Sequence, residues 1–194
     1  MSVPPEFNKE NTEAIESALS WLRQVAMSRN RNDSASLAAI PAPALNNEQA
    51  GPFASLSETL DEPDRLLLIL SLSPHITHTL LEEILLVSGA GMPGRASNRI
   101  ATTGLVQGAQ FQGYLPTALT FLYLAAGENV GHRVQLMQWL SEGRSQLIKK
   151  EKVILAPHKP LEPVFSGVLY LPPPVIYDLL MIRPDSAPDN HGSL

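Results

Sequence analysis

The chain has 194 residues, 44% of them hydrophobic and 17% charged, which suits one domain with a sizeable core, and its lack of cysteine excludes disulfides, thiolate catalysis and cysteine-based metal sites. The net charge of −5 argues against nucleic acid as the main partner, because phosphate binding draws on a surplus of lysine and arginine. Neither a signal peptide nor an uninterrupted apolar stretch of membrane-spanning length is visible, so we expect a cytoplasmic protein with no membrane partner.

The first predicted element is an amphipathic helix over residues 11–29, capped by Asn11 or Thr12. At 100° per residue one side is apolar and consists of Ala14, Ile15, Ala18, Leu19, Trp21, Leu22, Val25 and Ala26. We favour packing of this side on the domain's own core, because amphipathic helices usually bury their apolar face. The alternative is a docking or oligomerisation helix in which Trp21 contacts a partner.

The composition predicts three segments. Residues 30–51 are rich in Ala, Pro, Asn and Ser and poor in bulky side chains, which is typical of a flexible linker. We therefore expect an N-terminal helix and linker over residues 1–51 and a compact helical domain over residues 52–182. The polar residues 183–194 are expected to form a disordered tail.

The compact part begins with two predicted helices. Asp61 is a good cap for an apolar helix, and Ser73 followed by Pro74 indicates the start of a second one. A continuous second helix would place His75, His78 and Glu82 on one side, and two imidazoles with a carboxylate are a possible zinc site. Because the spacing departs from HExxH and no further ligand cluster is obvious, we favour a polar surface and predict no metal site.

A glycine-rich connection follows over residues 88–113. Residues 89–96, GAGMPGRA, partly match the phosphate-binding loop of nucleotide hydrolases. Arg95 stands where that loop has lysine, Ala96 stands where it has a magnesium-binding Ser or Thr, and the preceding segment indicates a helix. We therefore favour a flexible connection between helices and predict no catalytic residue and no cofactor.

Residues 114–140 predict two helices joined by a tight turn. Pro116 lies in the first turn, Gly127 ends the first helix, and Asn129 caps the second. The second helix has an apolar side that consists of Val130, Val134, Leu136, Met137 and Leu140. Trp139 falls outside that side, near His132 and Gln135, so these three residues, with Trp21, are the predicted partner-binding residues.

The last part predicts a β-hairpin and a short helix. Residues 146–155 and 164–171 have strand-like apolar content and are joined by a proline-rich connection, and three prolines then open a helix. Helix, turn, helix, hairpin and helix follow one another as in a winged-helix unit. The predicted fold is thus mainly α with a small β-hairpin, a helical domain with a winged-helix-like C-terminal half.

A winged helix raises the alternative of a nucleic-acid-binding regulator. The second helix of the pair carries only His132 and Arg133 as cationic or near-cationic groups. A modest basic patch near the hairpin consists of Arg144, Lys149, Lys150 and Lys152. Since winged-helix units also dock proteins, we favour a protein partner.

Four segments over about residues 66–180 form a pattern: LLLILSLSPHI, YLPTALTFLYLAAGENVGHR, KVILAP and SGVLYLPPPVIYDLL. The most specific residues are Leu115, Pro116, Thr117, Ala126, Gly127 and Arg133. Together these segments resemble the N-terminal region of AAA+ ATPases encoded with phage-tail-like contractile injection systems, and of related bacterial ATPases.

The resemblance implies a non-enzymatic protein-interaction domain. In that family the ATP-binding module is expected to follow this region, and the present sequence shows no such module before Leu194, so ATP hydrolysis is not carried over. The expected roles are recognition of cargo or a partner, as in effector loading, or support of ATPase ring assembly.

Overall fold

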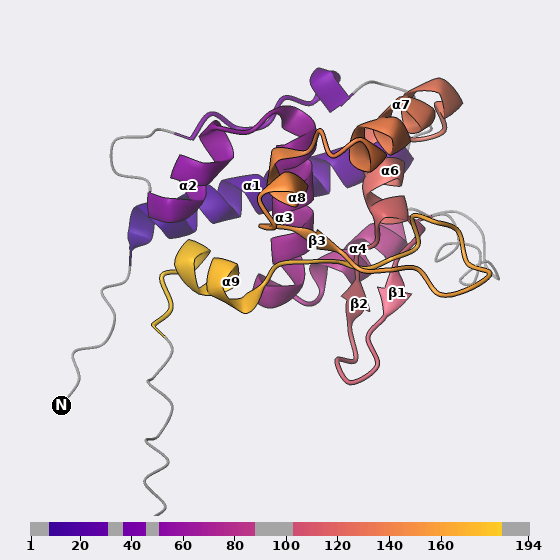
Figure 1. Cartoon of the computed structure of the whole chain (residues 1–194). Coiled ribbons are helices and arrows are strands. Elements are labelled where there is room, and N and C mark those ends of the chain that lie inside the picture. The colour runs from indigo at the N-terminus through magenta and orange to yellow at the C-terminus, as the bar shows by residue number, and fades with distance from the viewer. Residues whose placement is uncertain (1–7, 31–36, 46–50, 88–102, 184–194) are drawn as a thin grey trace, which may run out of the picture.

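The computed structural model describes residues 8–30, 37–45, 51–87 and 103–183. Over these ranges the chain is mainly helical, with two small antiparallel strand pairs (Figure 1), which confirms the predicted class at this level. The helices are α1 (Lys9–Asn30), α2 (Gly51–Glu58), α3 (Glu62–Ile76), α4 (Leu80–Val87), α6 (Ala118–Ala126), α7 (Val130–Ser141), α8 (Gln146–Lys149) and α9 (Pro173–Leu179), with a 3-10 turn, η1 (Leu37–Ala39). The strands are β1 (Val106–Gln107), β2 (Tyr114–Leu115), β3 (Ile154–Leu155) and β4 (Leu169–Tyr170).

Helix α1 contributes one whole side to the hydrophobic core. Every residue of its predicted apolar side is buried, and the helix packs against α2, α3, α4 and α6. Figure 1 shows α1 running across the molecule, with α2 near one end and α6 near the other. The favoured prediction, packing on the chain's own core, is confirmed.

The described part of the predicted linker, residues 37–45, packs on the same core. Leu37 and Leu45 are buried, and the carbonyl of Ile40 accepts a hydrogen bond of 2.7 Å from the Trp21 indole nitrogen. The expectation of a flexible tether is wrong for these residues. The overall composition of residues 30–51 indicated a flexible tether. Burial of Leu37 and Leu45 and the hydrogen bond to the Ile40 carbonyl nevertheless fix residues 37–45 on the core.

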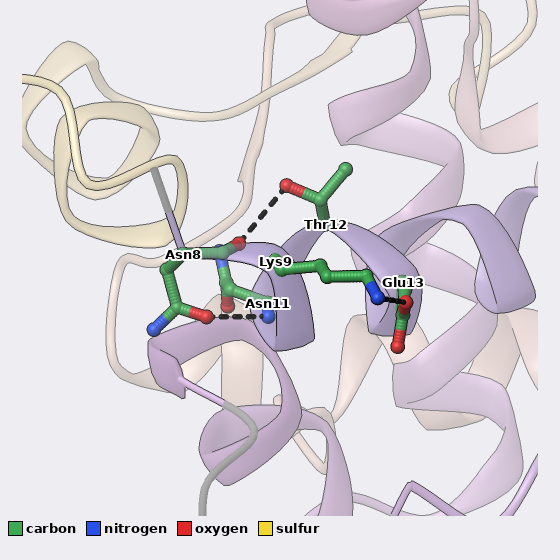
Figure 2. A network of polar contacts seen from close by, with 5 residues as sticks. All are labelled: Asn8, Lys9, Asn11, Thr12 and Glu13. Atoms are coloured by element: carbon green, nitrogen blue, oxygen red, sulfur yellow. Dashed lines mark hydrogen bonds and ion pairs between the residues drawn. The ribbon is translucent and has the colours of Figure 1, made fainter. Parts of the chain in front are cut away.

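The first turn of α1 is capped one turn earlier than predicted. Asn8 Oδ1 accepts from the Asn11 backbone N–H at 2.8 Å, and the Thr12 hydroxyl donates to the Asn8 carbonyl at 3.1 Å (Figure 2). The Asn11 side chain is therefore free to form tertiary hydrogen bonds. Its Oδ1 accepts from the Phe53 N–H at 3.1 Å, and its Nδ2 donates to the Leu179 carbonyl at 2.9 Å, joining α1 to α2 and α9.

Helix α3 starts as predicted but does not end as predicted. Asp61 accepts from the Asp64 N–H at 2.9 Å and caps the helix. Pro74 does not restart the chain, since α3 continues to Ile76. Proline has no N–H for the carbonyl one turn back, that of Leu70, and the Ser73 hydroxyl donates to this carbonyl at 2.9 Å instead.

The β3–β4 hairpin is shorter than predicted. Residues 146–149 form α8 in place of a strand, because the Ser145 side chain accepts from the Ile148 N–H at 3.2 Å and caps a helix there. Beyond it, Ile154 pairs with Tyr170 and Leu155 with Leu169 in antiparallel register.

Strand β4 also contacts the segment that leads into α6. The Leu169 N–H donates to the Pro116 carbonyl at 2.8 Å, and Thr117 forms an antiparallel bridge with Val168. Strand β4 therefore lies between β3 and residues 116–117, which ties the base of the hairpin to the start of α6.

A second hairpin, β1–β2, overlaps the predicted flexible connection: β1 lies within residues 88–113, whereas β2 consists of the first two residues of the stretch 114–140, which was predicted to be helical. Val106 pairs with Leu115 and Gln107 with Tyr114, and the Gly108 N–H donates to the Gly113 carbonyl at 3.0 Å. The connection is thus ordered from Thr103 to residue 113, contrary to the expectation, whereas residues 88–102 lie outside the described part of the chain.

Candidate functional site

The α6–α7 pair is held rigidly at its turn. Thr117 and Thr120 form a capping box at the start of α6, and Gly127, with a φ of 55°, ends the helix in a conformation that glycine adopts most easily. Asn129 then caps α7 by accepting from the His132 N–H at 3.0 Å. The end of α6 and the cap of α7 agree with the predictions. Pro116, by contrast, precedes the helix.

A buried arginine of α1 completes this turn. The Arg29 guanidinium donates from Nε to the Leu124 carbonyl at 2.7 Å and from Nη2 to the Ala125 carbonyl at 3.1 Å. These are carbonyls of the last turn of α6, which have no partner within the helix and carry partial negative charge. The frame of the α6–α7 pair therefore depends on α1.

Helix α7 presents a different face to solvent from the one predicted. Leu136 and Leu140 are buried as expected, but Val130 is 73% exposed and Val134 is 46% exposed. The buried side is turned toward Trp139, because α7 packs chiefly on α6 and meets the Phe121 ring there. The expected apolar side is thus wrong for its two valines.

Trp139 stacks on Phe121, with ring centroids 6.1 Å apart and planes 25° apart. Trp139 was predicted to fall outside the apolar side of this helix, and its side chain is half-buried against the core. His132 is also half-buried and Gln135 is exposed. The spacing of 132, 135 and 139 puts all three on one side of α7, so the structure brings these predicted residues together.

Trp21 does not join them. Its side chain is only 3% exposed and lies in the core, so it offers no surface to a partner in this structure. The amphipathic pattern that suggested a docking helix is explained by burial against α2, α3, α4 and α6.

The candidate metal residues do not share a helix. His75 belongs to α3, which ends at Ile76, whereas Glu82 belongs to α4, and His78 lies between the two helices. Within residues 8–30, 37–45, 51–87 and 103–183, no group of three or more metal-ligating side chains is found. Burial lowers the pKa of the His75 imidazole. Residues 89–96, the partial match to a phosphate-binding loop, lie outside the described residues.

Only part of the predicted basic patch is an unpaired cationic surface among the described residues. Arg144 forms an exposed ion pair with Glu142 at 2.9 Å, which neutralises one of the four positive charges of the patch. Lys149 and Lys150 are exposed at the end of α8, and Lys152 is half-buried. The patch is therefore a small cationic surface beside the hairpin.

The connection between β3 and β4, residues 156–168, runs out to one side of the molecule (Figure 1). Two successive turns shape it: the Glu162 N–H donates to the Lys159 carbonyl at 3.1 Å, and the Ser166 N–H donates to the Pro163 carbonyl at 2.9 Å. We call residues 157–166 the hairpin tip. Leu161 lies in its first turn with a φ of 71° and full exposure.

The hairpin tip was not among the functional candidates predicted from the sequence. The signal was available, since Pro160 followed by Leu161 places a bulky apolar residue where a turn of this kind favours glycine. Arg29 was not singled out from the sequence either, although its side chain binds the last turn of α6.

The chain matches no protein-family model, no curated protein and no solved structure. Among the helices of the described residues, none is long and apolar enough to cross a membrane.

Proposed function

We propose that this chain is a non-enzymatic protein-interaction domain of a bacterial, cytoplasmic AAA+ ATPase linked to a contractile injection system. It recognises a cargo protein or an apparatus component, or it supports assembly of the ATPase ring. The observation that carries the proposal is the exposed side of α7, where Gln135 and part of His132 and Trp139 lie on a helix whose start is capped by Asn129. The sequence resemblance over residues 66–180 gives the kind of partner.

The composition of this surface suits a protein partner. The exposed residues of α7 include two valines, two glutamines and a serine, and Trp139 adds part of an indole ring. Aromatic residues are enriched at the centres of protein interfaces, whereas Lys, Glu and Asp are depleted there. The half-buried Arg133 adds the cationic group that such interfaces often contain, and its Nε has no hydrogen-bond partner among the described residues.

The proposal includes a winged-helix-like arrangement of the C-terminal half. It is supported by the α6–α7 pair, by the hairpin that follows, and by β4 lying between β3 and residues 116–117. The non-enzymatic role is supported by the use of buried charged groups. Arg29 binds helix carbonyls and Asp64 binds the start of α8, so both stabilise the fold.

The test is co-purification with the ATPase module and the tail-like components of a contractile injection system, expressed together with this chain. We expect one of these proteins to bind the wild type. Val134→Glu and Gln135→Arg, both at exposed positions that the fold tolerates, should each weaken binding at least about tenfold. Ser55→Arg, on the exposed side of α2, is the matched control and should bind as the wild type does.

Two results would contradict the proposal in different ways. Equal affinity of the wild type and both α7 variants would show that the partner binds elsewhere. Absence of any ATPase or apparatus component from the wild-type complexes would remove the proposed function itself.

The second candidate is a nucleic-acid-binding regulator, favoured only by the exposed Lys149 and Lys150 beside the hairpin. Retention of duplex DNA at low salt, lost on raising the salt and in the Lys149→Glu, Lys150→Glu double variant, would support it. No retention at low salt would end it.

A further inference from the structure

The hairpin tip combines two features that are unfavourable in the free chain. Leu161 has a φ of 71°, a left-handed conformation that crowds a side chain with a Cβ and that glycine or asparagine adopts at less cost. Its side chain is also fully exposed, at 106% of the reference area, so a large apolar group faces water. A sequence optimised only for stability would have Gly or Asn at this turn position.

The tip is nevertheless well defined. Pro160 occupies the turn position before Leu161, where its fixed φ suits the turn, and Pro163 opens the second turn. The Ser166 hydroxyl donates to the Glu162 carboxylate at 3.2 Å and adds a further restraint between the two turns. At the base, the Phe165 and Gly167 carbonyls accept from the first two N–H groups of α6.

A restrained loop loses little conformational entropy when it binds, so its apolar side chains contribute more of their burial to affinity. Local strain that the surrounding structure maintains is typical of functional sites. Val164, 64% exposed, is a second apolar side chain of the same tip.

We propose that the hairpin tip is a preorganised anchor that inserts Leu161, with Val164, into an apolar pocket of the partner protein. This inference rests on the proposed function and assigns to the partner a second contact, distinct from the α7 surface. It gives a reason for keeping Leu161 in a conformation and an environment that both cost free energy in the unbound chain.

The charges of the tip favour a protein over a membrane or a nucleic acid. Lys159 and Glu162 flank Leu161 in the same turn with opposite charges. A membrane-binding loop typically combines several large apolar or aromatic residues with cationic ones, and a nucleic-acid-binding tip carries a surplus of cations. A neutral tip with aliphatic side chains fits an apolar pocket on a protein.

The decisive variant is Leu161→Asn, which removes the apolar side chain and accepts the left-handed conformation. We expect opposite effects on stability and on binding. The midpoint of thermal unfolding of the free chain should rise by about 2 °C or more, because the strain is relieved. The affinity for the purified partner should fall at least about tenfold. Val164→Ser should weaken binding in the same direction, by less.

The matched control is Met27→Gln, which also replaces an exposed apolar side chain, on α1. We expect the same partner affinity as for the wild type. If the partner binds the wild type and Leu161→Asn equally well, the anchor is overturned while the proposed function stands. If no ATPase or apparatus component binds the wild type, the proposed function and the anchor fall together.

Two further measurements separate the other classes of ligand. Wild-type chain is mixed with phosphatidylcholine–phosphatidylglycerol vesicles, and separately with a duplex DNA, and the Leu161→Asn variant is treated in the same way. The anchor predicts no Leu161-dependent binding to either. Loss of vesicle or DNA binding in Leu161→Asn would overturn it, as would a lower unfolding midpoint of this variant, which would make Leu161 a structural residue.

Discussion

Asp64 shows how one buried carboxylate links distant parts of the chain. It lies fully buried in the first turn of α3 and accepts from the Ser145 hydroxyl at 2.5 Å and from the Gln146 N–H at 2.8 Å. Burial raises its pKa, and the hydrogen bonds from Ser145 and Gln146 oppose that rise. Asp64 therefore fixes the N-terminus of α8, just before the hairpin that carries the proposed anchor.

Asp64→Ala should destabilise the fold by about 2–3 kcal/mol, because it leaves the buried Ser145 hydroxyl and the partly buried Gln146 N–H without an acceptor. Ser145→Ala should cost about 1 kcal/mol, since it removes both a cap and one donor to Asp64. The double variant should be less destabilised than the sum, because the two side chains share one interaction. Urea unfolding measures all three free energies, with the exposed Glu142→Ala as the control. Strict additivity would show that the two side chains act independently.

His75 predicts a pH dependence of stability. His75 is an exposed residue, but its partial desolvation lowers the pKa of the imidazole from the ordinary value of about 6.5, so the unfolded chain binds the proton more tightly than the folded one. The contribution of His75 is thus fully present above about pH 6.5 and is lost as the pH falls through the folded-state pKa. Thermal unfolding at pH 7.5 and 5.5 should show a smaller loss for His75→Gln than for the wild type. The same loss in both would rule out His75 as the source.

At the scale of the elements, local signals predicted helix ends best where a cap acts within a few residues. Asp61, Gly127 and Asn129 all end or begin helices where the sequence placed them. The predicted helix start at Pro74 was wrong because the Ser73 hydroxyl donates to the Leu70 carbonyl, to which proline has no N–H to donate, and the helix continues. Residues 146–149 were predicted to form a strand from their composition, but the Ser145 cap stabilises a helix there.

The sequence predicted which residues of α7 lie together in the candidate site better than it predicted which side of α7 is buried. His132, Gln135 and Trp139 do share one side of α7, as helical spacing requires. Which apolar residues of α7 are buried was not predictable from α7 alone, because Phe121 on α6 decides it by stacking on Trp139. The exposed and strained Leu161 was equally beyond a search for periodicity, since its conformation follows from a turn and not from a repeat.

Two serines of α3 give opposite predictions. Ser73→Ala removes the hydroxyl that serves the Leu70 carbonyl and should destabilise by about 1 kcal/mol. The Ser71 hydroxyl is buried with no hydrogen-bond partner among the described residues, so Ser71→Ala should be neutral or stabilise by up to about 1 kcal/mol. Denaturant unfolding of both variants measures the difference. A larger loss for Ser71→Ala than for Ser73→Ala would contradict the assignment.

At the scale of the whole molecule, α1 joins the two ends of the fold. Near its start Asn11 binds α2 and α9, and near its end Arg29 binds the last turn of α6. The surface proposed for the partner is thus supported by a helix at the other end of the sequence. The division of the chain into residues 1–51 and 52–182 stays a prediction, and the contacts of α1 provide its test.

Removal of residues 1–30 should therefore abolish cooperative folding of the remaining chain. Five large apolar side chains of α1 are buried, namely Ile15, Leu19, Trp21, Leu22 and Val25. At about 1.5–3 kcal/mol each, their burial is comparable with the whole stability of a typical domain, about 5–15 kcal/mol. Circular dichroism should show a loss of helix beyond that of α1, and the fluorescence of Trp139 should indicate a solvated indole.

A milder variant separates the loss of α1 from the loss of its end contact. Arg29→Met keeps the apolar stem and removes the donors to the Leu124 and Ala125 carbonyls, so it should cost about 2–3 kcal/mol and leave a cooperative transition. Lys9→Ala, which removes only an exposed ion pair, should change stability by less than about 0.5 kcal/mol. A truncated chain that still unfolds cooperatively with a buried Trp139 would instead show that the rest of the chain folds without α1. In that case α1 would be available for a partner, as the amphipathic pattern of residues 11–29 also allowed.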